Sequence, residues 1–110
     1  MSPAYACLCT QTVSIYRRQD SQAVRTVVDN CFLQMRKIRK EDVLGDQSDT
    51  SFLLIIPGEE EKVFPGDRIL EGVGPEKLSW QQTGTFAQVE YVQPCYWEGK
   101  RCHTEAGRGR

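Results

Sequence analysis

The pattern of apolar and polar positions along the chain predicts a series of short β-strands. Residues 12–17 alternate, with Val13 and Ile15 on one face, which is the period of a half-buried strand. Residues 51–56 contain a continuous apolar run, Phe52 to Ile56, that stops at Pro57. A run without alternation predicts a strand that is buried on both faces.

The second half of the chain continues this pattern, with turn residues between the apolar stretches. Residues 67–71 predict a short strand after Pro65-Gly66, a pair typical of a type II turn. Residues 85–93 alternate as a further strand, and Gly99 predicts the turn of a final hairpin. These patterns assign the following residues to the core: Val13, Ile15, Leu54, Ile56, Ile69, Val89 and Tyr91.

Residues 24–35 support two interpretations. Their apolar positions recur at helical spacing, which favours an amphipathic helix. Their β-branched composition and the Asp29-Asn30 pair favour a strand with a bulge at that pair. We predict the strand and keep one short helix as the alternative.

A long charged segment, residues 36–49, separates this region from the apolar run. Four bases precede four acids in it: Arg36, Lys37, Arg39, Lys40, Glu41, Asp42, Asp46 and Asp49. A loop of more than about 12 residues in a small domain is often functional or disordered. We therefore expect either a projecting, functional loop or a solvated one.

Together these elements predict one mainly all-β domain over residues 1–110, a small five- to six-stranded barrel or sandwich with a long internal loop. Residues 1–11 and 106–110 are expected to be flexible termini. The length suits a single domain, and no signal peptide or membrane-spanning run is predicted.

Charge and cysteine content narrow the chemistry. The net charge of −1 does not favour generic nucleic-acid binding. An odd number of cysteines, five, argues against a disulfide framework. Cys7, Cys9, Cys102 and His103 offer the four ligands of a structural zinc, but without the usual spacing, so we predict no metal.

Catalytic and cofactor motifs are not found in the sequence. Its single histidine, His103, is predicted to lie near a flexible terminus, which is a weak basis for a Cys–His pair. Gly72-Val73-Gly74 runs into Pro75, which has no backbone N–H to offer a phosphate. We therefore predict no enzyme and no cofactor, although a cysteine-based enzyme or zinc protein stays a minor alternative.

The order of short motifs resembles the small head-closure (stopper, or head–tail joining) proteins of tailed bacteriophages and related prophage proteins encoded beside minor capsid genes. The resemblance covers about residues 12–107. It is carried by VSIYRR at 13–18, RTVV at 25–28, DTSFLLIIP at 49–57, FPGDRILEG at 64–72, AQVEYV at 87–92 and RCHTEAG at 101–107.

This resemblance implies a virion protein, assembled in the host bacterial cytoplasm, that forms a homo-oligomeric ring between the portal side of the capsid and the tail. Its implied partners are copies of itself, neighbouring portal or adaptor and tail proteins, and packaged DNA, with no membrane. Residues 36–49 would then be the projecting loop.

Three large aromatic residues, Trp80, Tyr96 and Trp97, are candidate interface anchors, or else ordinary core residues. In an alternative from a different class, the chain is a small β-barrel binding module for single-stranded nucleic acid. The same aromatic residues would then stack on bases.

Overall fold

The computed structural model describes residues 9–38 and 49–108 and confirms the mainly β fold. Its elements are β1 (Gln11–Gln19), β2 (Gln22–Ile38), β3 (Asp49–Pro57), β4 (Arg68–Glu71), β5 (Leu78–Ser79), the 3-10 helix η1 (Gln81–Thr83), β6 (Ala87–Gln88), β7 (Tyr91–Trp97) and β8 (Lys100–Arg108). This is more strands than predicted, because the short β5 has almost no sequence pattern of its own and the predicted strand 85–93 is divided into β6 and β7.

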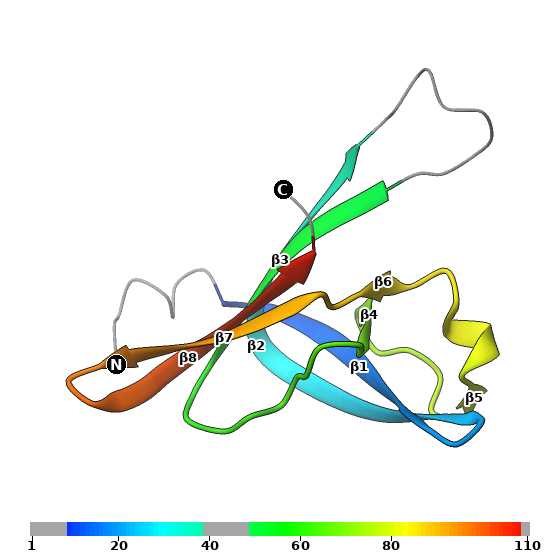
Figure 1. Cartoon of the computed structure of the whole chain (residues 1–110), viewed down its shortest axis with the longest axis horizontal. Helices are drawn as coiled ribbons and strands as arrows, with labels where there is room; N and C mark the ends of the chain where they lie inside the picture. Colours follow the sequence, from blue (N-terminus) through cyan, green and yellow to red (C-terminus); the bar gives the residue numbers. More distant parts are fainter. Residues whose placement is uncertain (1–8, 39–48, 109–110) are drawn as a thin grey trace.

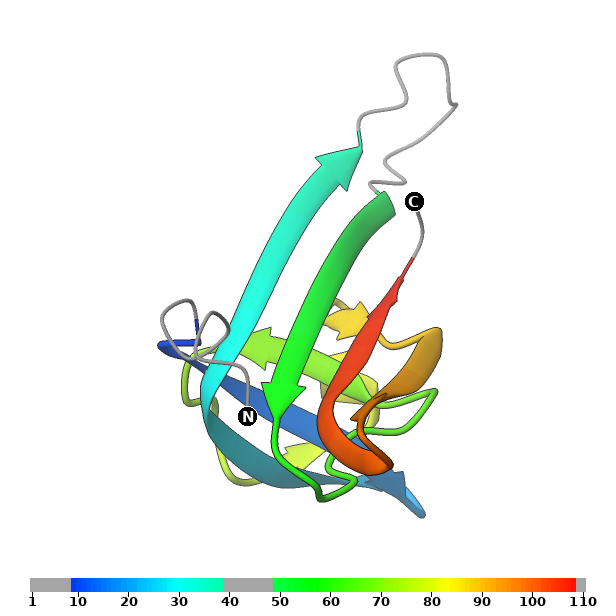
Figure 2. The same cartoon turned by 90° about the vertical axis from the view of Figure 1, so that its left-hand side faces the viewer.

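The strands form a curled, half-barrel sheet in the order β6-β4-β1-β2-β3-β8-β7, with β5 paired to β2 (Figures 1 and 2). All pairs are antiparallel. The long strand β2 joins the two halves of the sheet. Its first half pairs with β1 on one side, and its second half pairs with β3 on the other.

Residues 24–35 are strand, as predicted, and the helix alternative is wrong. The register between β1 and β2 shifts because Gln11 opposes Cys31 whereas Val13 opposes Val28. One additional residue therefore sits at the predicted bulge, where Asn30 has φ 56°. The bulge changes the spacing of core positions from two to three, so that Val28 and Cys31 both point inward. This spacing contributes one step to the helix-like periodicity of the sequence, whereas Val24, Val27 and Met35 are exposed.

The core lies on the concave side of the sheet and contains six of the seven predicted residues: Val13, Ile15, Leu54, Ile56, Ile69 and Val89. Tyr91 is a wrong prediction, because its side chain is 38% exposed. Strand β3 also differs from expectation. Phe52, Leu54 and Ile56 are buried, but Leu53 and Ile55 on the other face are only half-buried.

The predicted strand 85–93 is divided between the two halves of the sheet. β6 pairs with β4, and after Val89 and Glu90 the chain continues as β7, which pairs with β8. Glu90 donates its backbone N–H to the Gly107 carbonyl at 2.8 Å as the chain crosses. Because the alternation restarts at this crossing, Tyr91 points away from the core.

The final hairpin is confirmed, and it is longer than expected. Glu98 and Gly99 have φ of 52° and 78°, the two left-handed positions of a two-residue hairpin turn. β8 then runs to Arg108, with Ala106 fully buried. The expectation of a flexible tail from residue 106 is therefore wrong for residues 106–108, and Gln11 at the other end already belongs to β1.

The loop after β4 is held to β1 by buried and partly buried hydrogen bonds, although β1 and this loop lie far apart in the sequence. The Ser14 hydroxyl donates to the Gly72 carbonyl and accepts from the Gly74 N–H, both at 2.8 Å. The Tyr16 hydroxyl donates to the Pro75 carbonyl at 2.7 Å. Strand β1 is consequently buried on both faces, with Ser14 and Tyr16 both at 0% exposure.

Candidate functional site

The predicted charged loop is shorter than the sequence indicated. Arg36 and Lys37 belong to β2 and Asp49 begins β3, because these residues extend the antiparallel pairing beyond the predicted strand ends. This corrects the boundaries of the predicted segment. The rest of its charged residues lie outside the described residues: Arg39, Lys40, Glu41, Asp42 and Asp46.

The paired ends of β2 and β3 project from the sheet as a two-stranded arm (Figure 2). Strand β8 pairs with β3 only as far as Phe52, which lies opposite Arg108. The last three pairs of the arm, formed by residues 36–38 with residues 49–51, have no third strand beside them within the described chain. We call these residues the β2–β3 arm. At its base, Met35 is 42% exposed.

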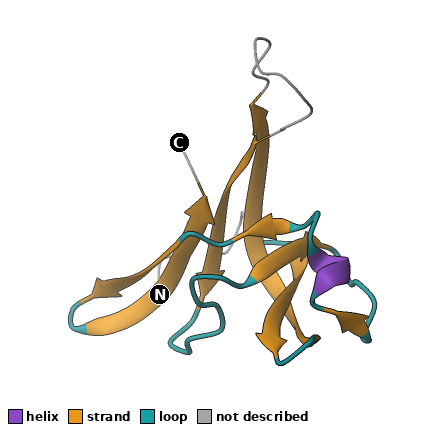
Figure 3. Ribbon diagram, turned by 45° about the vertical axis from the view of Figure 1, so that its right-hand side comes forward, coloured by secondary structure: helices purple, strands orange, loops and turns teal. Residues whose placement is uncertain are grey.

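The three candidate aromatic residues are not brought together. Tyr96 and Trp97 are 62% and 69% exposed at the end of β7, next to the hairpin turn. Trp80 is half-buried between β5 and η1. Figures 1 and 3 place the β7–β8 turn and the β5–η1 region at opposite ends of the molecule. A single stacking surface formed by all three is therefore not present.

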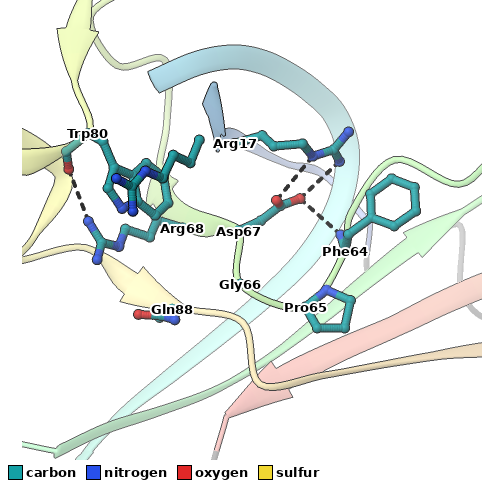
Figure 4. A pocket seen from close by; sticks show the side chains of 9 residues that line it. Arg17, Phe64, Pro65, Gly66, Asp67, Arg68, Trp80 and Gln88 are labelled. Atoms are coloured by element: carbon teal, nitrogen blue, oxygen red, sulfur yellow. Dashed lines mark hydrogen bonds and ion pairs between the residues drawn. The ribbon is translucent and has the colours of Figure 1, made fainter. Parts of the chain in front are cut away.

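A different group of residues lines an open depression of about 590 Å³ at the end that carries Trp80 (Figure 4). We call it the arginine depression, because three guanidinium groups line it. Its lining residues are Arg17, Arg18, Phe64, Pro65, Gly66, Asp67, Arg68, Trp80 and Gln88.

One wall of the arginine depression is the turn that the sequence predicted at Pro65-Gly66. Gly66 has φ 95°, and the Asp67 N–H donates to the Phe64 carbonyl at 3.1 Å, which is the geometry of a type II turn. Two backbone hydrogen bonds of 2.8 Å join Val89 to Gly66 and Asp67. The turn is thereby fixed against the β6–β7 connection.

Asp67 organises this wall, because its side chain is buried and fully engaged. The carboxylate accepts hydrogen bonds from Arg17 Nε at 3.1 Å and Arg17 Nη2 at 3.0 Å. It accepts a third bond of 2.9 Å from the Phe64 N–H. The Arg17 guanidinium also lies over the Phe64 ring, 4.2 Å from its centroid. Such a bidentate pair fixes the orientation of the arginine as well as balancing its charge.

The opposite wall is built around Arg68. Its guanidinium lies over the Trp80 ring at 4.0 Å from the centroid. Its Nη1 donates to the Trp80 carbonyl at 3.0 Å and to Thr83 Oγ1 at 2.9 Å. Burial lowers the pKa of Arg68, and the nearby charge of Arg18 lowers it further. Arg68 is therefore held in place by neutral groups and faces a second positive charge.

The charges in the arginine depression do not balance. Its described lining residues include one negative charge, the Asp67 carboxylate, and three positive charges, the guanidinium groups of Arg17, Arg18 and Arg68. The site therefore carries an excess of two positive charges, in a chain whose net charge is −1. The chemistry offered is that of an anion site with planar, donor-rich walls.

The sequence did not predict this site. Its charged members come from the end of β1 and the start of β4, so only the fold brings them together. The local signals were present, however. Arg17-Arg18 before a turn and Asp67-Arg68 after Pro-Gly are adjacent charges at strand ends.

The cysteines do not form a metal site within the described chain, where no group of three or more metal-ligating side chains was found. Cys9 and Cys31 are buried, and burial raises the pKa of both thiols, that of Cys31 to about 11. Cys95 is half-buried with a pKa that burial also raises. His103 lies in β8 at 8% exposure rather than in a mobile tail, and Cys7 lies outside the described residues.

Comparison with known proteins gives no assignment: no family model, curated protein or solved structure matches the chain. Among the described residues, no helix is long and apolar enough to cross a membrane.

Proposed function

We propose that the chain is a structural assembly protein whose β2–β3 arm docks on a neighbouring subunit, and that the assembly is the head–tail connector of a tailed bacteriophage. The observation that supports docking is the arm itself. Its outer pairs, Arg36 with Ser51 through Ile38 with Asp49, have no third strand beside them within the described chain.

An isolated two-stranded ribbon is only marginally stable in water, so a projecting one gains from a surface that covers it. Its strand edges also present unpaired backbone groups, which a neighbouring subunit can pair. The arm includes the beginning of the charged segment 36–49, in which four basic residues precede four acidic ones, and Arg36 is exposed on β2. Opposite charges on one segment allow the same contact to repeat from copy to copy, as a ring requires.

The phage connector is the particular assembly favoured by the resemblance in motif order. In that assembly the partners are further copies of the chain, portal or adaptor proteins, tail proteins and packaged DNA, and the protein resides in the virion. The exposed Tyr96 and Trp97 at the β7–β8 turn supply a second contact surface, because large exposed aromatics commonly anchor interfaces.

The alternative of a single-stranded nucleic-acid module that stacks bases on the three aromatics is less consistent with their positions. One face of Trp80 is occupied by the Arg68 guanidinium. Tyr96 and Trp97 belong to the β7–β8 hairpin at the other end of the molecule. Only the β7–β8 end of the molecule could therefore offer free aromatic faces to a single-stranded nucleic acid.

The decisive experiment compares self-association of the full chain with that of an armless variant. In the variant, residues 36–51 are replaced by Asn-Gly, a favoured two-residue hairpin turn, between the paired residues Met35 and Phe52. Sedimentation velocity over a range of concentrations and negative-stain electron microscopy are the measurements. We expect ring-sized particles from the full chain and folded monomers from the variant.

Val73→Ala serves as the matched control, since it alters an exposed apolar side chain in the loop after β4, outside both the arm and the β7–β8 turn. It tests whether loss of assembly is specific to the arm. A full chain that stays monomeric at every concentration, alone and with purified portal and tail-completion proteins, would refute the proposal. Assembly that survives in the armless variant would refute the role of the arm.

A further inference from the structure

We propose that the arginine depression binds a phosphate group, which Arg18 and Arg68 contact directly and which either a nucleic-acid backbone or a small phosphate compound supplies. This inference is independent of the assembly role, because β4 and the β5–η1 region, which carry Arg68 and Trp80, lie away from the β2–β3 arm (Figure 1).

The first argument is the unbalanced charge. Arg17 is matched by Asp67 in a bidentate pair, which leaves Arg18 and Arg68 as the excess. Their mutual repulsion contributes to the lowered pKa of Arg68. A bound anion would remove this repulsion and return favourable energy to a partly buried group. A phosphate monoester carries about −1.5 to −2 charges at neutral pH, which matches the excess of the site.

The second argument is preorganisation. Both described hydrogen bonds of the Arg68 guanidinium come from Nη1, and its plane is held against Trp80. The Nε and Nη2 donors are therefore already oriented, and little side-chain entropy is lost when they meet a ligand. Arg18 is exposed, and its Nε donates to the Asp20 carbonyl at 2.9 Å, which leaves its terminal nitrogens for the anion.

The third argument is the role of the Arg17–Asp67 pair as a fixed wall. Asp67 is only 3% exposed, and its three hydrogen bonds hold it to Arg17 and to the turn. Its carboxylate therefore stays on Arg17 and leaves Arg68 to a ligand. Guanidinium groups bind phosphate through paired N–H donors, so phosphate fits these walls by geometry as well as charge. The exposed amide of Gln88 adds a neutral donor at the rim.

The test uses the full chain at low ionic strength with two probes: inorganic pyrophosphate, and a short fluorescein-labelled oligothymidylate. Calorimetry follows the first and fluorescence anisotropy the second. We expect at least one probe to bind with a Kd below about 1 mM. Tighter binding of the oligonucleotide identifies the nucleic-acid backbone as the source, and tighter binding of pyrophosphate identifies a small phosphate compound.

Variants assign the binding to the site. Arg18→Gln and Arg68→Gln should each weaken binding by about tenfold and reduce the salt dependence by about one ion. Lys100→Gln removes the same charge at the other end of the molecule and should change the affinity less than about twofold. Because Arg68 also contributes to packing, the exposed Arg18 provides the variant least expected to disturb folding.

The inference would be overturned by three results. These are failure of both probes to bind, wild-type affinity in Arg18→Gln and Arg68→Gln, or an equal loss in Lys100→Gln. Measuring the armless variant with the same probes separates this site from the assembly role. We expect that variant to bind phosphate even though it does not assemble.

Discussion

Removal of one buried hydroxyl, in Ser14→Ala, tests whether the loop after β4 stabilises the fold. The Ser14 side chain is 0% exposed, and its oxygen joins the Gly72 carbonyl and the Gly74 N–H. Alanine leaves two backbone groups without that partner. Gly74 is buried and Gly72 is half-buried, so water cannot fully replace the lost bonds.

The magnitude follows from the number of groups affected. Leaving a buried donor or acceptor unsatisfied costs about 1–3 kcal/mol, so two such groups, one of them half-buried, predict a loss of about 3 kcal/mol. Against a total stability of about 5–15 kcal/mol, this loss is large. With a urea m-value of about 1.5 kcal/mol/M, the midpoint of unfolding should fall by roughly 2 M.

Urea unfolding followed by tryptophan fluorescence measures this shift. Ser21→Ala, which removes an exposed hydroxyl in the β1–β2 turn, is the control and should change stability by less than about 0.5 kcal/mol. A double-mutant cycle with Tyr16→Phe should show coupling of about 0.5 kcal/mol or more, since both side chains hold the same loop. A midpoint shift below about 0.3 M for Ser14→Ala would refute the reasoning.

Two further predictions concern packing and pH. A methyl group in Gly107→Ala would collide with the Phe52 carbonyl oxygen, so we expect the thermal midpoint of unfolding to fall by about 8 °C or more. The exposed Gly84→Ala is the control. Equal midpoints for the two variants would contradict the prediction. The pKa of Cys31 is raised from 9.0 to about 11, mainly by burial, so the thiol ionises more readily in the unfolded chain. The contribution of Cys31 to the free energy of unfolding should therefore be constant below about pH 9 and decrease as the pH rises towards 11. Cys31→Val should lack this part of the decrease in alkaline denaturation, and an unchanged profile would contradict the prediction.

The parts of the fold that were predicted from sequence are those set by neighbouring residues. The strand at 51–56, the turn at Pro65-Gly66 and the hairpin at Gly99 each depend on local φ preferences or a local apolar run. The bulge at Asp29-Asn30 was predicted for the same reason, because both residues disfavour a helix interior. Local conformational preference was sufficient in each case.

Features set by tertiary pairing were not predictable in this way. Tyr91 was assigned to the core because the alternation was extended across the point where the chain passes from β6, which pairs with β4, to β7, which pairs with β8. The arginine depression was missed because the net charge of the chain averages over the whole surface. Arg17 and Asp67 are separated by 50 residues, and no local pattern indicates that they pair.

The bulge in β2 also decides which residues beyond it face the core. A strand alternates sides at every residue, so the extra residue at the bulge lets Cys31 and Leu33 lie on the same side as Val28. Regular alternation from Val28 without the bulge would instead place Phe32 inward and Leu33 outward. The local conformation at Asn30 therefore determines which side chains of residues 31–35 face the core, before the arm itself begins.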